Sequence, residues 1–138
     1  MTPEQKIADL GLTLPEVAAP AGAYVPAVRT GNLVYTSGQV PFVDGKLQRT
    51  GKLGADLTTE EGAEQARVCA LNALAALKAE VGDLSKVVRI VKVVVFVASD
   101  PGFTEQPKVG NGASQAAGHL ENPAAVRAWL AGIVGRPG

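Results

Sequence analysis

The stretch VRTGNLVYTSGQVP, Val28 to Pro41, decides the fold of this chain. Gly31-Asn32 is a two-residue turn signal between two runs rich in β-branched and aromatic residues. Such a pattern predicts a β-hairpin, with strands over residues 24–29 and 33–40. Pro41 closes the second strand because proline has no backbone N–H to donate to a sheet.

The second strand of this hairpin carries a polar run, Thr36-Ser37-Gly38-Gln39, where a plain hairpin would hold more apolar residues. One interpretation is simple polarity at a sheet edge. The other is a cleft, in which a small hydroxyl and a glycine let a ligand approach the backbone and Gln39 bonds across a subunit contact. Strict alternation puts two sets of side chains on opposite faces: Leu33, Tyr35, Ser37 and Gln39 on one, and Val34, Thr36, Gly38 and Val40 on the other.

Helices and one long strand are predicted outside the hairpin. Thr2 and Pro3 open a short helix over 3–11, and the capping-box spacing of Thr58 and Glu61 opens a long one over 59–81. The valine-rich run 87–98 predicts a strand with both faces largely covered, by helices or by neighbouring subunits. A second long helix is predicted over 106–119.

The last segment also has a helical pattern. Asn122 and Pro123 have the residue types of an N-cap and a first helical position. Val126, Trp129, Leu130 and Ile133 follow at positions i, i+3, i+4 and i+7. These spacings predict an amphipathic helix over 123–134.

Length and charge limit the function classes. The 138 residues predict a single domain over 1–138. Lys plus Arg number 13 and Asp plus Glu number 13, so the chain has no net charge to attract nucleic acid, and self-association is permitted. The N-terminus lacks a secretory signal and the longest apolar run, 93–98, is too short to span a bilayer. These features predict a cytoplasmic protein with no nucleic-acid or membrane partner.

The chain has no strong catalytic motif and no pattern of metal ligands. Cys69 is the only cysteine and His119 the only histidine, which excludes an intrachain disulfide and a cysteine-based zinc site. We therefore expect no metal and no reactive thiol, with Cys69 packed in or beside the core.

Three stretches together resemble the RidA/YjgF family, whose older name is the L-PSP endoribonuclease family. They are AYVPAVRTGNLVYTSGQVP, GDLSKVVRIVKVVVFVAS and FTEQPKVGNGAS, and the resemblance covers about residues 15 to 115. It implies an α+β fold of the Bacillus chorismate mutase type, a mixed sheet with two helices packed on one face. It also implies a homotrimer with a cleft at each subunit boundary.

The resemblance further implies a small-molecule site and an activity. The family's cleft residues match Tyr24, Ser37 and Asn111, which are the expected substrate-binding residues. The implied reaction is the hydrolysis of reactive 2-imino or enamine acids to keto acid and ammonia. No metal or organic cofactor is implied, and the partner is a small carboxylic acid or imine.

Residues 116–138 depart from the family pattern. The family continues into two strands that carry a substrate-binding arginine and a glutamate, and this chain has HLENPAAVRAWLAGIVGRPG instead. Arg127 falls in the predicted last helix and no residue matches the glutamate, so no catalytic residue is assigned. A short helix in place of the family's strands, and a shifted reading frame, are the hypotheses for this segment. The alternative function is a non-catalytic oligomer that binds a small molecule or has a structural role.

Overall fold

The computed structural model of the protein describes residues 2–118 and 126–135. Its elements in chain order are α1 (Pro3–Asp9), β1 (Ala27–Thr30), β2 (Leu33–Gln39), β3 (Phe42–Val43), β4 (Lys46–Leu47), α2 (Thr59–Val81), η1 (Leu84–Lys86), β5 (Val87–Val97), α3 (Gln106–Ala117) and β6 (Val126–Val134). The four longer strands form one sheet, and β3 and β4 form a separate small ribbon.

The hairpin predicted around Gly31-Asn32 is present. Strands β1 and β2 pair antiparallel, with Thr30 opposite Leu33 and Val28 opposite Tyr35. Gly31 has a φ of 56°, in the left-handed region that glycine enters without steric cost. The predicted first strand begins too early, because pairing starts at Ala27.

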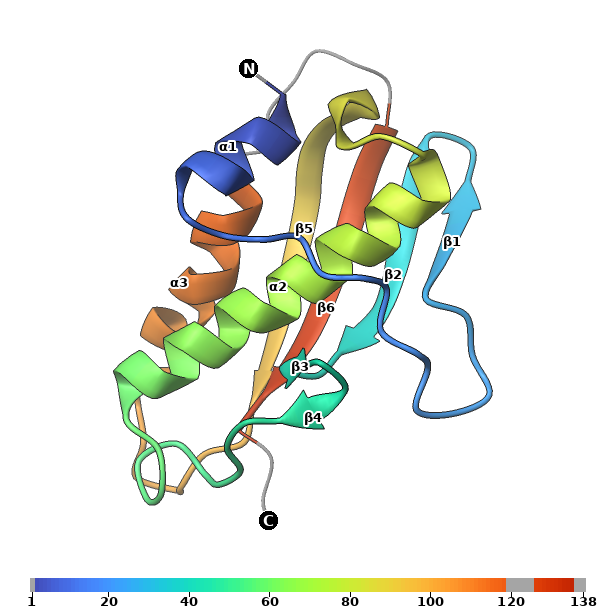
Figure 1. Ribbon diagram of the computed structural model, residues 1–138. Coiled ribbons are helices and arrows are strands. Elements are labelled where there is room, and N and C mark those ends of the chain that lie inside the picture. The colour runs from blue at the N-terminus through green and yellow to red at the C-terminus, as the bar shows by residue number, and fades with distance from the viewer. Residues whose placement is uncertain (1, 119–125, 136–138) are drawn as a thin grey trace.

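The sheet order is β1-β2-β6-β5, and β6 runs parallel to both of its neighbours (Figure 1). The helix predicted over 123–134 is therefore wrong for residues 126–134, and residues 123–125 lie outside the described residues. Leu130, Gly132 and Val134 are buried, which is the period-two pattern of a strand. This alternation is not apparent in the sequence, because the middle inward position, Gly132, has no apolar side chain.

Helices α2 and α3 pack together on one face of the sheet (Figure 1). Their crossing is close at Gly112, where an added Cβ would lie 1.9 Å from the carbonyl oxygen of Ala63. The α+β class, the mixed sheet and the two helices on one face are confirmed by this arrangement.

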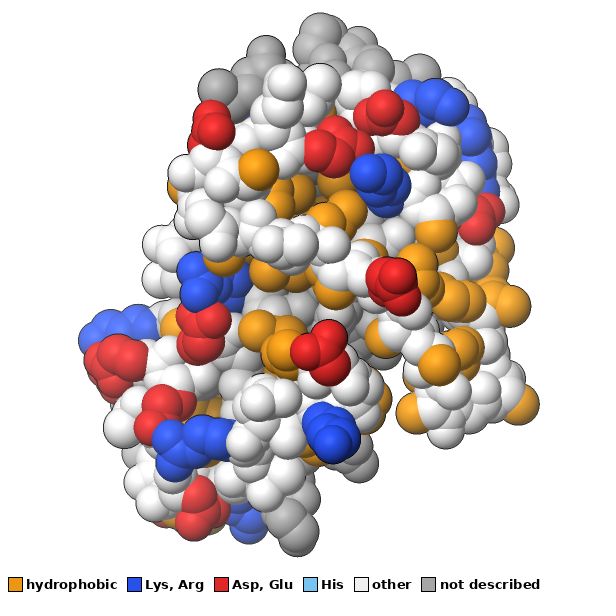
Figure 2. Space-filling view, viewed as in Figure 1, with side chains coloured by type: hydrophobic (Ala, Val, Ile, Leu, Met, Phe, Trp, Pro, Cys, Tyr) orange, Lys and Arg blue, Asp and Glu red, His pale blue; other side chains and the backbone are white. Residues whose placement is uncertain are grey.

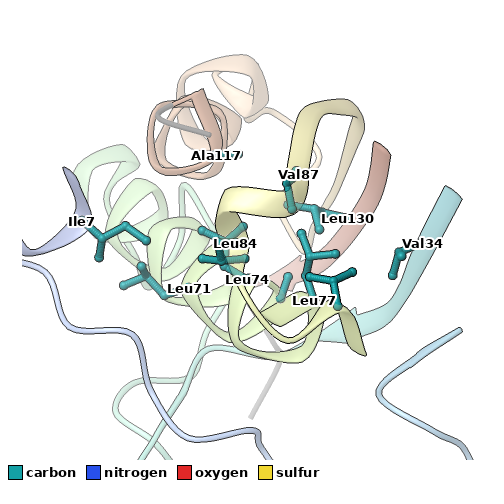
Figure 3. Packing of buried hydrophobic residues seen from close by; sticks show 11 residues of the cluster. Ile7, Val34, Leu71, Leu74, Leu77, Leu84, Val87, Ala117 and Leu130 are labelled. Atoms are coloured by element: carbon teal, nitrogen blue, oxygen red, sulfur yellow. The ribbon is translucent and has the colours of Figure 1, made fainter. Parts of the chain in front are cut away.

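The core consists of two hydrophobic clusters under the helices. The larger one joins α2 to the strands through buried side chains such as Leu74, Leu77, Val87 and Leu130 (Figure 3). The smaller one joins α2, α3 and the end of β6, and it includes Cys69, which is buried as expected. Among the described residues, no helix is long and apolar enough to cross a bilayer.

The sheet face away from the helices exposes large apolar side chains. Tyr35 lies between the buried Val34 and Thr36, so it points away from the core, and Val28 stands opposite it. Phe96 lies between Val95 and Val97, which pack under the helices, and it is 61% exposed. This uncovered apolar face indicates a surface for association.

Candidate functional site

A β-bulge interrupts β2 within the polar run. Tyr35 stands opposite residue 129 of β6 and Gly38 stands opposite residue 131, so β2 has one more residue than its partner over this interval. An extra residue in one strand reverses the side of every residue that follows. As a result Gln39 is buried and Gly38 is exposed, and the strict alternation predicted for these two positions is wrong. The polar run is thus the place where the strand is irregular.

The bulge places Ser37 beside Gln39. The Nε2 of Gln39 donates to the carbonyl oxygen of Ser37 at 3.3 Å and to its Oγ at 3.4 Å. Because the Ser37 hydroxyl accepts this bond, its own proton remains available to a ligand. In the part of the chain that the structure describes, no imidazole or carboxylate bonds to Ser37. Its chemistry is therefore that of a hydrogen-bond donor and not of an activated nucleophile.

Tyr24 lies in the segment between α1 and β1, which we call the lead. Like the Ser37 hydroxyl, its own hydroxyl accepts a hydrogen bond. The backbone N–H of Ala21 donates to the Tyr24 hydroxyl at 3.0 Å. The phenol proton is therefore also free to be donated. Tyr24 and Ser37 consequently present two hydroxyl donors from two different segments.

Tyr24, Ser37, Gly38 and Gln39 line one hollow, together with residues 18–20 of the lead. Its volume is only about 20 Å³, which is room for one water molecule. An added Cβ at Gly38 would meet no atom within 4 Å, so the space beside Ser37 is open. Within a single chain the hollow is therefore small and is open beside Gly38.

Asn111, the third predicted substrate-binding residue, is not brought to this hollow within one chain. It is exposed on α3, and α3 packs against α2 and β5. Strand β5 is at the opposite edge of the sheet from β1, as Figure 1 shows. One chain thus joins Tyr24 to Ser37 and leaves Asn111 apart.

The hollow has no charged lining residue in the part of the chain that the structure describes. Arg127 stands in β6 opposite Leu33, which is four residues before Ser37 along β2. At about 3.3 Å per residue this separates their strand positions by roughly 13 Å. Sequence reasoning placed Arg127 on a helix, and the structure places it on strand β6.

Comparison with known proteins gives a family match over most of the chain. Residues 4–126 match the family model described as "YjgF/chorismate_mutase-like, putative endoribonuclease". Protein TCP17 of Trypanosoma cruzi is 50% identical over 105 residues, which are 76% of this chain and 66% of that protein. The match therefore spans just under two thirds of that relative's length.

Two solved structures have the same fold. A "putative endoribonuclease" from Shewanella oneidensis is 37% identical, with a TM-score of 0.82 over 96% of this chain and 88% of that one. Protein Atu1372 from Agrobacterium tumefaciens is 38% identical, with a TM-score of 0.76 over 95% of this chain and 80% of that one.

Proposed function

The chain belongs to the YjgF/chorismate mutase-like family, and from this premise we propose that it is a cytoplasmic homotrimer that hydrolyses small 2-imino acids in clefts between its subunits. The products are a 2-keto acid and ammonia. The observation that carries the proposal is the shared hollow of Tyr24 and Ser37, two hydroxyl donors that the family resemblance assigns to substrate binding.

The reaction needs water and two proton transfers. The oxygen of water forms a bond to the imine carbon, and a proton from that water moves to the imine nitrogen. As the resulting carbinolamine collapses, its hydroxyl proton moves to the amino group, the carbon–oxygen double bond forms, and the carbon–nitrogen bond breaks to release ammonia. In this proposal Ser37 and Tyr24 donate hydrogen bonds to the substrate and hold the imine carbon open to the water.

A neighbouring subunit supplies what the single chain lacks in this proposal. The hollow is too small to enclose an acid, and the exposed face with Val28, Tyr35 and Phe96 is apolar. A partner packed on that face would bury it and close the cleft. The same partner would bring Asn111 and a cation for the substrate carboxylate, drawn from the exposed Arg89 and Lys92.

The alternative function is a trimer that binds a small acid without converting it. It is favoured by one specific observation: the described part of the hollow contains no carboxylate or imidazole that could act as a general base. Both functions place the ligand against Ser37 and Gly38, and they differ in turnover alone.

The test compares the rate of 2-iminobutanoate loss with the protein and without it. We expect a clear acceleration, reduced at least tenfold by Gly38→Val, because the added side chain fills the open space beside Ser37. Gly102→Val is the matched control, since Gly102 also has open space around it and lies in the turn after β5. The melting temperatures of both variants should stay close to that of the original chain.

The outcomes separate the proposals. One outcome is a folded trimer that gives no acceleration yet binds 2-oxobutanoate saturably, with Gly38→Val abolishing that binding. This result would contradict the deaminase function and support the binding function. Equal activity of Gly38→Val and the original chain would contradict both. Salt-sensitive cleavage of single-stranded RNA would instead support a ribonuclease activity, which the family's description names.

A further inference from the structure

A second and larger hollow lies between the N-terminal lead, the β3–β4 turn and the middle of α2. Its volume is about 420 Å³, and we call it the lead pocket. Figure 2 shows the surface hollowed between the lead and the rest of this face. The lead pocket shares Ala18, Ala19 and Phe42 with the small hollow at Ser37, and its other lining residues are different.

The floor of the lead pocket holds a buried amide. Asn72 is only 3% exposed, and its Nδ2 donates to the carbonyl oxygens of Val40 and Phe42, each at 3.1 Å. Within the described residues, no group donates to its Oδ1. Asn72 lines the lead pocket.

Two carboxylates stand on the walls of the same pocket. Glu16 belongs to the lead and Asp44 to the β3–β4 turn, and both are exposed. Neither makes an ion pair or a side-chain hydrogen bond with the described residues, and no lysine or arginine lines the pocket. Three acceptors, two of them negatively charged, thus line one space that has no cationic side chain among its described lining residues.

The chemistry of this lining selects a cation with N–H donors. Calcium takes six to eight oxygen ligands, and the described residues contain no group of three or more acidic, cysteine or histidine side chains that could hold a metal. The remaining walls are apolar, with Pro15, Val17 and Phe42 among them. An organic ammonium offers three donors on one end and an apolar stem on the other.

We propose that the lead pocket binds a small organic ammonium ion. The ammonium group is held by the Asn72 carbonyl oxygen and by the carboxylates of Glu16 and Asp44, and its alkyl stem lies against Val17 and Phe42. This site is separate from the proposed deaminase cleft and does not depend on it. Because the two hollows share a wall, occupation of the lead pocket is expected to alter the surroundings of Ser37 as well.

The experiment is a titration of the isotope-labelled full chain with n-hexylammonium chloride at low ionic strength, followed by amide NMR. We expect saturable shifts of the Asn72 side-chain amide and of the Gly45 backbone amide. 1-Hexanol has the same stem without the charge, and hexanoate has the opposite charge. Neither should produce saturable shifts at these two positions.

The double variant Glu16→Gln, Asp44→Asn should weaken hexylammonium binding roughly tenfold, because two partly exposed ion pairs are lost. Asp44 has a φ of 51°, a conformation that asparagine also adopts readily, so the turn should be preserved. The matched control is Glu80→Gln, Asp100→Asn, which removes two exposed carboxylates elsewhere and changes the net charge equally. Binding in the control should stay within about twofold of the original.

Three results would overturn the proposal: no saturable shift with hexylammonium, equal binding of 1-hexanol, or equal weakening in the two double variants. None of them bears on the deaminase assay, which reports on the Ser37 hollow. A loss of deaminase activity likewise leaves the titration unaffected.

Discussion

Helix α2 and strand β6 contribute to the same hydrophobic core, yet only α2 has the structure that its local sequence predicts. The bounds of α2 are set by groups within or next to the helix. The Thr58 side chain accepts from the N–H of Glu61 at 3.2 Å, the Glu61 carboxylate accepts from the N–H of Thr58 at 3.0 Å, and Gly82 ends the helix with a φ of 90°. Segment β6 has a helical spacing of apolar residues and is nevertheless a strand.

The difference lies in where the backbone hydrogen bonds come from. A helix satisfies its backbone N–H and C=O groups within one segment. Its caps and its apolar stripe can therefore be recognised from residues close together in the sequence. β6 is paired on both sides, with β2 along one edge and β5 along the other. Without β6, the facing edges of β2 and β5 would have unpaired backbone N–H and C=O groups. The free-energy cost of leaving these groups unpaired outweighs the local helical pattern of residues 126–134.

The largest expected effect compares one substitution in the two regions. Leu77 of α2 and Leu130 of β6 are both buried in the same cluster (Figure 3). Replacing either by alanine should lower the free energy of unfolding by about 2–5 kcal/mol. The free energy of unfolding should fall by up to about 1 kcal/mol more in Leu130→Ala than in Leu77→Ala, because alanine favours a helix and disfavours a strand.

Urea denaturation at one fixed protein concentration measures this difference, since the stability of an oligomer depends on concentration. Leu10→Ala is the control, because Leu10 is half exposed and should change stability by less than about 0.5 kcal/mol. A larger loss in Leu77→Ala than in Leu130→Ala would show that backbone preference does not distinguish the two regions.

A smaller effect is expected at the start of α2. Thr58→Ala removes the side-chain acceptor for the N–H of Glu61 and should cost about 1 kcal/mol. Thr13→Ala, at an exposed position in the lead, is the matched control and should be close to neutral. If both variants had the same stability, the capping box would not determine where α2 begins.

The smallest effect is a pH dependence at Glu61. Its pKa is lowered, first by the backbone N–H of Thr58 and then by Arg49, with which it forms an ion pair. A carboxylate whose folded-state pKa is depressed stabilises the fold above its ordinary pKa, and this stabilisation is lost as the pH falls through the lower folded-state value. The original chain should therefore be more stable than Glu61→Gln near pH 7, and this gap in stability should shrink as the pH falls below the ordinary pKa of a glutamate.

Thermal unfolding of both proteins across this pH range measures the gap. Glu80→Gln in the same series separates the effect of Glu61 from that of losing any exposed carboxylate. A gap that stayed constant with pH would contradict a role for the ionised Glu61 carboxylate in the cap.

The candidate site was predictable in part. The hydroxyl of Ser37 and the phenol of Tyr24 were expected from the motif, and the structure places them in one hollow. The bulge that exposes Gly38 and buries Gln39 could not be predicted from the sequence, because it depends on the register of β2 against β6. Asn111 is not part of this hollow within one chain, since α3 packs at the other edge of the sheet.

The sequence by itself determined the hairpin turn at Gly31-Asn32, the capped start of α1, both ends of α2 and the β-branched strand β5, because these depend on neighbours a few residues away. The end of α1 was predicted at residue 11, and the helix ends at Asp9. Only the tertiary structure decided that residues 126–134 form the strand between β2 and β5, and that a bulge opens β2 at Ser37. The physical reason is that strand hydrogen bonds join residues far apart in the chain. Their geometry exists only when the whole sheet is assembled.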